Sequence, residues 1–330
     1  MSLTRTTKIA YVAAIAIASL ALAGCAPAAP VETGDTKTVT LITHDSFSMS
    51  KKLISSFEAE TGYKLEIVKS GDAGAMTNKL VLTKDAPLGD VVFGIDNTFS
   101  SVAANEGIID GKLTPVDFGD VCMNYDKDWF AKNETPAPSS IKDLTKPEYR
   151  GLTVLTNPAT SSPGMAFLAA TVSMFGEKGY GLYLQALANN DVKIDAGWED
   201  AYFTDFSGSS GKGAYPIVLS YSSSPAYEVR DNGESQTASI LDGCFRQTEY
   251  AGVLKGTDNA PGAQALIDFM LEDQFQMALP ESMYVYPINK NIELPAAWTE
   301  WATISDKPVG AELDIAANRK KWLSTWSEIF

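Results

Sequence analysis

The residue types that carry out catalysis are scarce in this chain of 330 residues. His44 is the only histidine, so a Ser-His-Asp triad would have to use it, and no Gly-x-Ser-x-Gly turn occurs. A zinc site built from Cys and His has too few ligands, and no paired carboxylate motif marks a general acid and base. The sequence therefore favours binding over catalysis, with an extracellular hydrolase as the less favoured alternative.

Polar side chains gather where three predicted strands end. In open α/β sheets, ligands bind in the crevice beyond the carboxyl ends of the strands. Each cluster alone is also ordinary turn chemistry, but three in succession favour a binding site. The strands are predicted at 38–43, 64–69 and 90–95, and the clusters after them are His44-Asp45-Ser46, Gly71-Asp72 and Asp96-Asn97.

A run of small hydroxyl residues precedes a predicted apolar helix at 165–175. It contains Thr160, Ser161, Ser162 and Gly164. Free backbone N–H groups at the positive end of a helix dipole can bind an anion. A plain Ser/Thr helix cap is the equally weighted alternative.

Three aromatic residues, Trp198, Tyr221 and Tyr227, lie in polar, turn-rich surroundings and outside any apolar periodicity. Aromatic residues placed in this way can stack on a flat ligand, or they can simply cover a surface. The sequence leaves both interpretations open.

The elements that must position these residues alternate along the chain. The strands above are separated by predicted helices at 50–60 and 74–83, which indicates a parallel sheet with right-handed crossovers. Apolar helices are also predicted at 263–275 and 315–329. The mature chain would hold 306 of the 330 residues, more than one hydrophobic core usually spans, so we expect two lobes.

The N-terminal segment predicts export. Arg5 and Lys8 precede an uncharged apolar run at 9–23, which is too short for a comfortable membrane span. The quartet at 22–25 resembles the bacterial lipoprotein cleavage box. We therefore expect a signal peptide at 1–24, lipidation of Cys25 as a membrane anchor, and a flexible tether at 25–37. An ordinary signal peptide is the alternative.

Two cysteines and a strong negative charge remain after this cleavage. Outside the cytoplasm, Cys122 and Cys244 favour one disulfide. Loss of Arg5 and Lys8 lowers the formal net charge from −15 to −17. This acidity argues against nucleic-acid binding. It is compatible with a cationic ligand, although it can also serve solubility alone.

Several segments, in this order and spacing, resemble the thiamine-binding proteins that feed thiamine ABC importers. The resemblance extends from about residue 38 to the C-terminus. It implies an α/β, two-lobed periplasmic-binding-protein fold, type II-like, with a mixed sheet flanked by helices in each lobe and the ligand in a hinged cleft. The segments are Thr43–Phe47, Val92–Asn97, Asn157–Gly164, Gly197–Tyr202, Ser220–Tyr227 and Tyr286-Pro287.

The resemblance also implies where the lobes divide. Lobe one would comprise 38–118 and about 245–290, and lobe two 119–244 and about 291–330. Cys122 would then follow the first strand between the lobes, and Cys244 would lie where the chain returns. Two hinge strands side by side would bring the sulfurs within reach.

The resemblance assigns roles to matching positions. Asp45 and Asp96 would face the aminopyrimidine and the cationic ring. The hydroxyl run from Thr160 to Gly164 would meet the hydroxyethyl arm or its phosphate. The aromatic walls would be Trp198, Tyr221 and Tyr227, and the remaining ligand-binding positions are His44, Ser46, Asn97, Tyr202 and Tyr284. Relatives often carry Tyr at the position of His44 and Trp at that of Tyr284.

The implied protein is an exported, lipid-anchored monomer without a cofactor or metal, and an ABC permease in the membrane is its partner. The ligand would be thiamine or a thiamine phosphate, and nothing in the sequence separates these forms. The alternatives in the same transport role are a polyamine, a phosphonate and ferric iron. Iron is disfavoured because no Tyr-Tyr pair is present.

Overall fold

Strands and helices alternate at the start of the folded chain, as predicted. The computed structural model describes residues 38–330, so the predicted signal peptide, Cys25 and the tether lie outside the described residues. β1 pairs in parallel with β2 and with β3, which confirms the predicted parallel sheet. The elements are β1 (Thr38–Thr43), α1 (Lys51–Thr61), β2 (Lys64–Lys69), α2 (Ala73–Leu82), β3 (Val91–Asp96) and α3 (Ser100–Glu106).

The first helix shows how local sequence sets these elements. The Ser50 side chain accepts a hydrogen bond from the Leu53 N–H, at 3.2 Å, and so caps α1. Leu53 and Phe57 are buried one turn apart, so they face the sheet. Gly62 ends the helix with a φ of +74°, a conformation that favours glycine.

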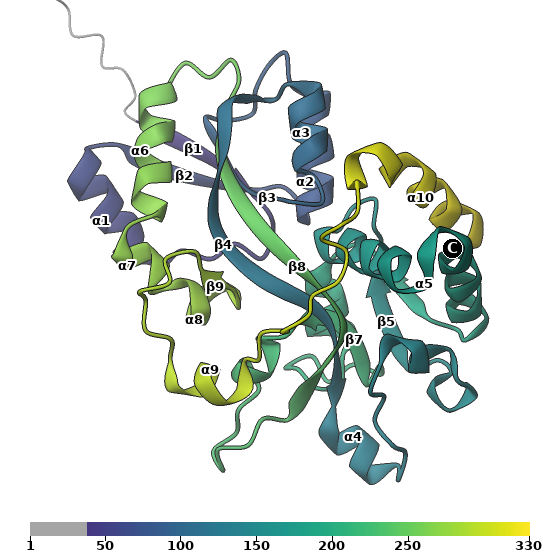
Figure 1. Cartoon of the computed structure of the whole chain (residues 1–330). Helices are drawn as coiled ribbons and strands as arrows, with labels where there is room; N and C mark the ends of the chain where they lie inside the picture. The colour runs from purple at the N-terminus through teal and green to yellow at the C-terminus, as the bar shows by residue number, and fades with distance from the viewer. Residues whose placement is uncertain (1–37) are drawn as a thin grey trace, which may run out of the picture. The chain divides into compact units, whose positions relative to one another are not determined.

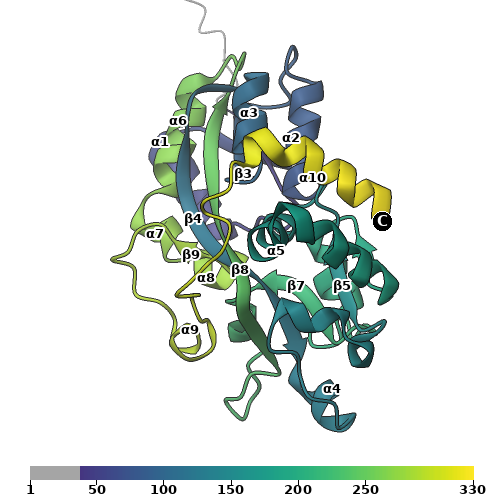
Figure 2. The same cartoon turned by 45° about the vertical axis from the view of Figure 1, so that its right-hand side comes forward.

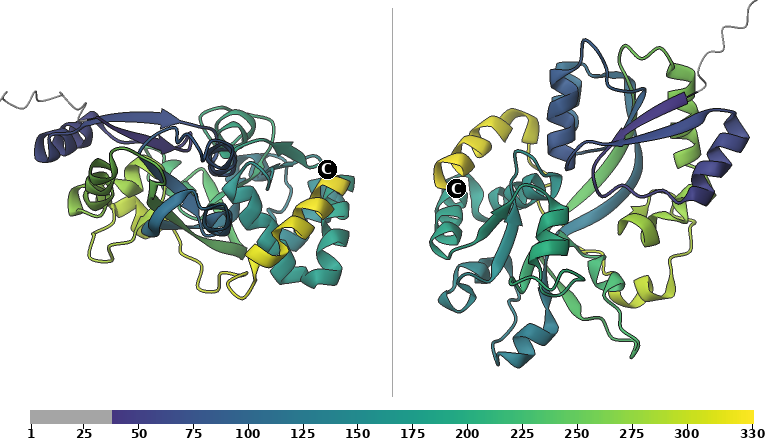
Figure 3. Two further views of the ribbon diagram at one scale, coloured as in Figure 1. Left: turned by 90° about the horizontal axis from the view of Figure 1, so that it is seen from above. Right: turned by 180° about the vertical axis from the view of Figure 1, so that it is seen from behind.

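Helices cover both faces of this first sheet region. Val39 and Leu41 of β1 pack with Phe57 of α1, whereas Ile42 packs on the other side with Met76 of α2. Successive strand residues point to opposite faces, so a strand with apolar residues on both faces needs a helix layer on each side. Figure 3 shows these layers from above and from behind.

Two long antiparallel strands join the lobes. β4 (Ile109–Asp126) and β8 (Thr237–Leu254) run side by side for most of their length, as Figure 1 shows. β8 pairs with β3 near one end, and β4 pairs with β7 near the other. The two expected lobe sheets are therefore joined into one nine-stranded sheet of order β2-β1-β3-β8-β4-β7-β5-β6, with β9 on β4.

The second lobe is built around β5, β6 and β7, which pair in parallel through β5. The predicted helix at 165–175 is the first half of α5, because the chain turns at Gly176 (φ +69°) and continues helical to Asn189. The elements of this lobe are α4 (Lys127–Lys132), η1 (Ile141–Thr145), η2 (Pro147–Tyr149), β5 (Thr153–Thr156), α5 (Ser162–Asn189), β6 (Lys193–Asp195), η3 (Asp200–Asp205), β7 (Ile217–Tyr221) and η4 (Ser224–Tyr227).

The C-terminal part of the chain returns to both lobes. The predicted helix at 263–275 is interrupted after Met270 and forms α6 and α7. α10 lies beside α5 (Figure 2), where the buried Trp322 donates its indole N–H to Glu177 Oε1 at 2.9 Å. The elements are α6 (Ala260–Met270), α7 (Asp273–Gln276), α8 (Leu279–Met283), β9 (Tyr286–Pro287), α9 (Ala296–Trp301) and α10 (Ile315–Ile329). Across residues 38–330, no helix combines the length and the apolar character needed to cross a bilayer.

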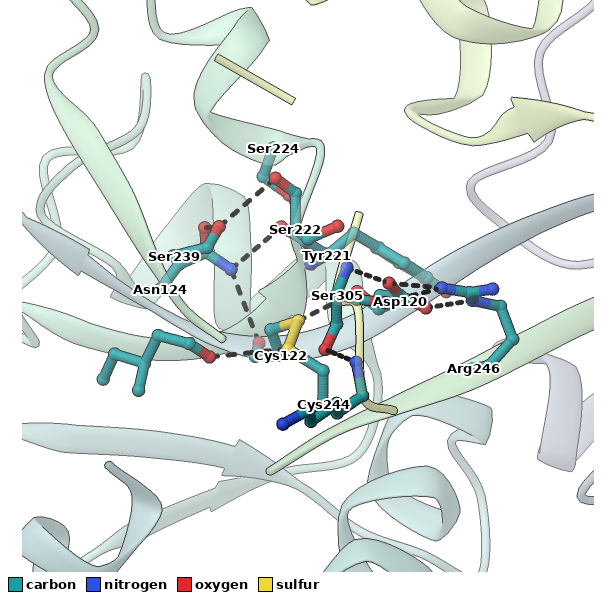
Figure 4. The surroundings of a disulfide bond; sticks show 12 residues. Asp120, Cys122, Asn124, Tyr221, Ser222, Ser224, Ser239, Cys244, Arg246 and Ser305 are labelled. Atoms are coloured by element: carbon teal, nitrogen blue, oxygen red, sulfur yellow. Dashed lines mark hydrogen bonds and ion pairs between the residues drawn. A yellow bond between two sulfur atoms is a disulfide. The ribbon is translucent and has the colours of Figure 1, made fainter. Parts of the chain in front are cut away.

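The hinge between the lobes is cross-linked. Cys122 on β4 and Cys244 on β8 form the predicted disulfide, with their Cα atoms 4.5 Å apart. Next to it, Asp120 accepts hydrogen bonds from the Arg246 guanidinium and, at 2.7 Å, from the Ser305 backbone N–H. Figure 4 shows that the segment around Ser305 lies against the two strands at this point. We call these five residues, together with β4 and β8, the hinge.

Candidate ligand-binding cleft

Two neighbouring cavities lie where the lobes face each other. The inner one, of about 30 Å³, has its lining drawn from both lobes. The outer one, of about 260 Å³, shares three lining residues with it, and we call the two together the cleft. The inner cavity is lined by His44, Ser46, Asp72, Ala73, Ser162, Pro163, Trp198, Tyr221, Glu249, Met283 and Val285. The outer cavity is lined by Asp45, Ser46, Gly71, Asp72, Ala75, Thr160, Ala196, Gly197, Trp198, Glu199 and Asp200.

The floor of the inner cavity is acidic: Glu249 lines it, and two further carboxyl groups stand next to Glu249 on the neighbouring strands. Asp96 on β3 and Asp117 on β4 are the register partners of Glu249 on β8, so three carboxyl groups stand in a row across adjacent strands. Their residues are 0, 0 and 5% exposed. Asp96 accepts hydrogen bonds from Thr98 and from the Phe99 N–H. Both carboxyl oxygens of Asp117 lack a hydrogen-bond partner among the described residues.

The pKa values of these three carboxyl groups are raised, so the groups keep protons at a pH where exposed carboxyl groups have lost them. Burial is the largest cause that raises the pKa of Glu249, and the nearby charge of Asp96 adds to it. Burial and the neighbouring Glu249 raise the pKa of Asp117 well above its ordinary value. Burial also raises the pKa of Asp96 to about 7, against the lowering effect of its hydrogen bonds and of Arg319. A cation that reached this floor would favour the ionised carboxylates.

His44 stands beside this acidic row as a neutral ring. Its Nε2 lies 3.6 Å from Glu249 Oε1, too far for a hydrogen bond. Burial, followed by the charge of Lys69, lowers the pKa of His44 to about 4. Gly94, at φ +100°, makes room for the ring, because a Cβ there would lie 2.2 Å from His44 Cδ2. The Nε2 atom is buried without a hydrogen-bond partner in the described chain.

Asp72 connects the two lobes across the cleft. It precedes α2 in lobe one, and its two carboxyl oxygens accept the Ser162 N–H at 3.1 Å and the Trp198 N–H at 2.9 Å, both from lobe two. Burial is the largest influence on this carboxyl and raises its pKa, although both N–H groups favour the charged form. Because Asp72 takes up the Ser162 N–H, the N-terminus of α5 already has an anionic partner.

The opposite wall is aromatic. Trp198 stacks on Tyr202 at a ring distance of 4.9 Å, and its indole N–H donates to Ser220 Oγ at 2.9 Å. The Tyr221 ring lies 6.1 Å from that of Trp198 and faces Gly119, where a Cβ would lie 2.9 Å from Tyr221 Cδ1. The Tyr221 hydroxyl donates to Gln247 Oε1 at 3.3 Å. The wall is thus held in place by packing and hydrogen bonds within the chain.

The structure brings only some of the sequence-predicted residues to the cleft. His44, Ser46, Ser162, Trp198 and Tyr221 line the inner cavity, and Asp45, Ser46, Thr160 and Trp198 line the outer one. The other predicted residues, which line neither cavity, are Asp96, Asn97, Ser161, Gly164, Tyr202, Tyr227 and Tyr284.

Two of the predicted residues outside the lining, Ser161 and Asn97, form hydrogen bonds within the chain. Ser161 caps α5 by accepting the Gly164 N–H and donates to Thr156 Oγ1 at 2.9 Å. The Asn97 amide exchanges hydrogen bonds with the β8 backbone at Arg246 and Thr248.

The remaining aromatic residues form a second layer around the wall. The Tyr202 hydroxyl donates to Glu228 at 2.9 Å. Tyr227 and Tyr284 contact each other, with ring centres 3.3 Å apart, and Tyr284 lies 6.1 Å from Trp198.

Sequence reasoning missed Glu249 and Asp117 and did not include Asp72 among the binding residues. Asp72 belongs to a polar cluster after a strand, so its position carried a usable signal. Glu249 and Asp117 stand inside long strands, where an acidic residue normally faces solvent. Only the pairing of β4 with β8 reveals that these two carboxyl groups face each other in the interior.

Comparisons with known proteins agree with this architecture. The family model described as bacterial extracellular solute-binding protein matches residues 94–306. The chain is 27% identical over 311 residues to the thiamine-binding periplasmic protein of Escherichia coli (strain K12), covering 87% of this chain and 92% of that one. It is 28% identical over 330 residues to the thiamine-binding periplasmic protein of Brucella suis biovar 1 (strain 1330), covering 93% and 95%.

A solved structure of a periplasmic thiamin binding protein superposes with a TM-score of 0.77 at 26% identity. The match covers 88% of this chain and 96% of that one.

Proposed function

The chain belongs to the bacterial extracellular solute-binding protein family, and from that premise we propose that it captures thiamine or a thiamine phosphate in the cleft and delivers it to an ABC import permease. The observation that carries this proposal is an aromatic wall facing an acidic floor within one interlobe cleft. The relatives named as thiamine-binding periplasmic proteins support the same ligand class.

The chemistry of thiamine matches the two sides of the cleft. Thiamine is a flat cation that carries an exocyclic amine and an alcohol arm. The rings of Trp198 and Tyr221 suit stacking and cation–π contact. The carboxyl groups of Glu249 and Asp72 suit the amine and the positive charge. His44, with a free buried ring nitrogen, adds one uncharged hydrogen-bonding group.

Capture requires the lobes to move. The inner cavity, about 30 Å³, has room for about one or two water molecules, which is far less than a thiamine ring needs. Entry therefore requires the contacts that Asp72 makes with lobe two to break, with bending in the hinge strands. We expect the solute to be bound and released unchanged, because the described residues that line the cleft supply stacking and charge and include no hydrogen-bonded pair of nucleophile and base.

The membrane anchor and the permease partner of the protein belong to the same proposal. Lipidation at Cys25 would tether the binding lobes to the membrane that holds the permease. A Cys25→Ala variant should lose lipid labelling and should be found as uncleaved precursor or as soluble protein. Unchanged lipid labelling of that variant contradicts the anchor.

A titration of tryptophan fluorescence tests the ligand, because Trp198 lines both cavities. Purified protein is titrated with thiamine, its monophosphate and diphosphate, spermidine and ferric citrate. We expect saturable binding of thiamine at micromolar or lower concentration. Binding of spermidine without any thiamine species would instead support a polyamine carrier, which the carboxylates of Asp45, Glu199 and Asp200 along the outer cavity would suit.

A further inference from the structure

We infer that Arg319 is a latch residue: it lies on α10 in lobe two, contacts lobe one when the lobes are closed, and slows the release of a bound solute. This inference rests on the proposed function and adds to it a residue outside the cleft lining that sets the affinity. The support is the way in which α10 and the turn that Arg319 contacts are each held in their own lobe, together with the chemistry of the contact.

α10 is fastened to α5, so it moves with lobe two. The buried Trp322 donates its indole N–H to Glu177 Oε1 at 2.9 Å, and the hydroxyls of Thr325 and Tyr180 lie within hydrogen-bond distance at 2.9 Å. Arg319 precedes Trp322 by three positions on the same helix. Figure 2 shows α10 passing from α5 toward α3 of lobe one, which it also contacts.

The turn that Arg319 contacts belongs to lobe one and directly follows β3. Asp96 ends this strand and accepts hydrogen bonds from the Thr98 hydroxyl at 2.8 Å and from the Phe99 N–H at 3.1 Å. β3 pairs with β1 in the sheet of lobe one. The turn is therefore held to that sheet, and a rotation of one lobe against the other changes its distance from Arg319.

The contact itself combines a hydrogen bond with stacking. Arg319 Nη1 donates to the Thr98 carbonyl at 3.1 Å, and the guanidinium carbon lies 3.8 Å from the ring centre of Phe99. A guanidinium can make both contacts at once, because its donors lie at the edge of a plane whose face stacks on aromatic rings. No carboxylate among the described residues shares a hydrogen bond with this guanidinium.

The Arg319 guanidinium thus loses water on contact with lobe one without gaining an ion pair. Burial lowers the pKa of Arg319 to about 10, and the charge of Asp96 opposes this shift. A charge taken out of water without a paired charge is costly. When the lobes open, hydration replaces the contact, so the net free energy between the two states is smaller than the contact alone would give. A latch that must release its solute requires this balance.

Phe99 is also enclosed on a second side. A Cβ at Gly74 of α2 would lie 2.5 Å from Phe99 Cζ and 2.7 Å from the carbonyl carbon and oxygen of Thr160, which belongs to lobe two. Glycine therefore permits the backbone of Thr160 to approach, beside the hydrogen bond from the Ala75 N–H to the Thr160 carbonyl at 2.8 Å. Lobe two thus reaches the surroundings of Phe99 both at the rim and through Arg319, so we expect the rim and the latch to close together.

Stopped-flow fluorescence with thiamine tests the latch, because Trp198 lines both cavities. Arg319→Met keeps an apolar stem and removes the charge and the donors. We expect its thiamine dissociation rate to rise about three- to tenfold. The association rate should stay within about twofold, because a latch acts after the ligand has entered. Dissociation at the wild-type rate, or a loss in the association rate alone, overturns the inference.

Matched variants separate the latch from the general loss of an arginine. Arg319→Lys keeps the charge but lacks the planar fork, so its dissociation rate should lie between those of the wild type and Arg319→Met. If Arg319→Met does not fold, Arg319→Lys carries the same test. Arg150→Met removes an exposed arginine that pairs with Asp191 at 2.8 Å, and its dissociation rate should equal that of the wild type. An equal rise in Arg150→Met contradicts the inference.

Small-angle X-ray scattering without ligand tests the latch apart from the identity of the solute. Arg319→Met should have a larger mean radius than the wild type and Arg150→Met, because the closed state loses a contact between the lobes. An unchanged radius overturns the latch. If the wild type binds no thiamine, the proposed function fails, and the comparison of radii still decides whether Arg319 holds the lobes together.

Discussion

The lobes meet at the hinge, at the rim of the cleft and where Arg319 of α10 donates to the Thr98 carbonyl at 3.1 Å, and the interactions at the hinge and the rim differ in kind. At the hinge, two continuous strands are joined by the Cys122–Cys244 disulfide and by the contacts of Asp120. At the rim, the contacts between the lobes are non-covalent, and several of them are hydrogen bonds. These are Asp72 with the N–H groups of Ser162 and Trp198, the Ala75 N–H with the Thr160 carbonyl at 2.8 Å, and the Asn78 amide with the Ala159 carbonyl at 3.1 Å.

On the proposed function, this difference would let the chain open repeatedly without losing its architecture. Each rim hydrogen bond contributes roughly 0.5–1.5 kcal/mol net, so the rim as a whole is held by an amount that ligand binding can balance. The hinge is covalent and cannot separate. We therefore expect opening to separate the lobes at the rim and not at the hinge, with the ligand setting which state is populated.

Removal of the hinge cross-link should have the largest effect. The C122S/C244S double variant should lose about 2–5 kcal/mol of the free energy of unfolding, because the disulfide closes a long loop of sequence separation 122. Urea unfolding under non-reducing conditions measures this loss. Thiamine affinity should change little, and an equal loss of affinity and stability would remove the distinction between hinge and rim.

Truncation of the aromatic wall comes next. Trp198→Ala should lower the free energy of unfolding by about 3 kcal/mol, because the indole is buried and packs against Tyr202 and Phe203. It should weaken thiamine binding by about 1–3 kcal/mol through lost stacking and cation–π attraction. Trp198→Phe is the matched control, and its affinity should fall by less. Calorimetry on both variants gives the comparison, and unchanged affinity in both would place the ligand elsewhere.

The acidic floor should make both stability and binding depend on pH. Glu249→Gln should weaken thiamine binding by about 2 kcal/mol through loss of a charge-assisted contact. In the protein without ligand, the raised pKa of Glu249 means that the folded state holds a proton that the unfolded chain has lost. Stability should therefore fall as the pH rises from the ordinary glutamate pKa, about 4.3, through the raised one.

Thiamine affinity should rise with pH over the same window, because the cation favours the ionised form. Thermal melts and calorimetry at several pH values check both trends, which Glu249→Gln should flatten. Glu293→Gln, at an exposed site, is the control. Trends of equal slope in Glu249→Gln and the wild type would contradict this prediction. The titratable groups around Glu249 are His44, Asp72, Asp96, Asp117 and Tyr221.

The smallest effect is expected at the edge of the rim. Asn78→Ala removes one exposed hydrogen bond to the Ala159 carbonyl, so the closed state should lose about 0.5–1 kcal/mol. Small-angle X-ray scattering without ligand should then show a larger mean radius. The free energy of unfolding should barely change, and a loss as large as that of the disulfide variant would contradict the assignment to the rim.

The sequence by itself determined the elements and several of their endpoints. Short runs of β-branched and apolar residues predicted β1, β2 and β3. The apolar periodicity at 315–329 predicted α10. The two cysteines that remain beyond the predicted lipidation site formed the pair that was predicted. Trp198 and Tyr221 were recognised because they interrupt polar surroundings. These features follow from local chemistry, which depends on residues close together in the chain.

The tertiary structure alone decided how the cleft is charged. Asp117 and Glu249 are 132 positions apart in the sequence, and they face each other only because β4 and β8 pair in one register. Asp72 of lobe one lies 90 and 126 positions before its partners Ser162 and Trp198 of lobe two, so only the packing of the lobes brings them together. A register shift of one residue would turn Glu249 to the opposite face, and no local pattern encodes that choice. The sequence thus predicted a site for a flat cation, whereas strand pairing and the packing of the two lobes decided which carboxylates line the cleft.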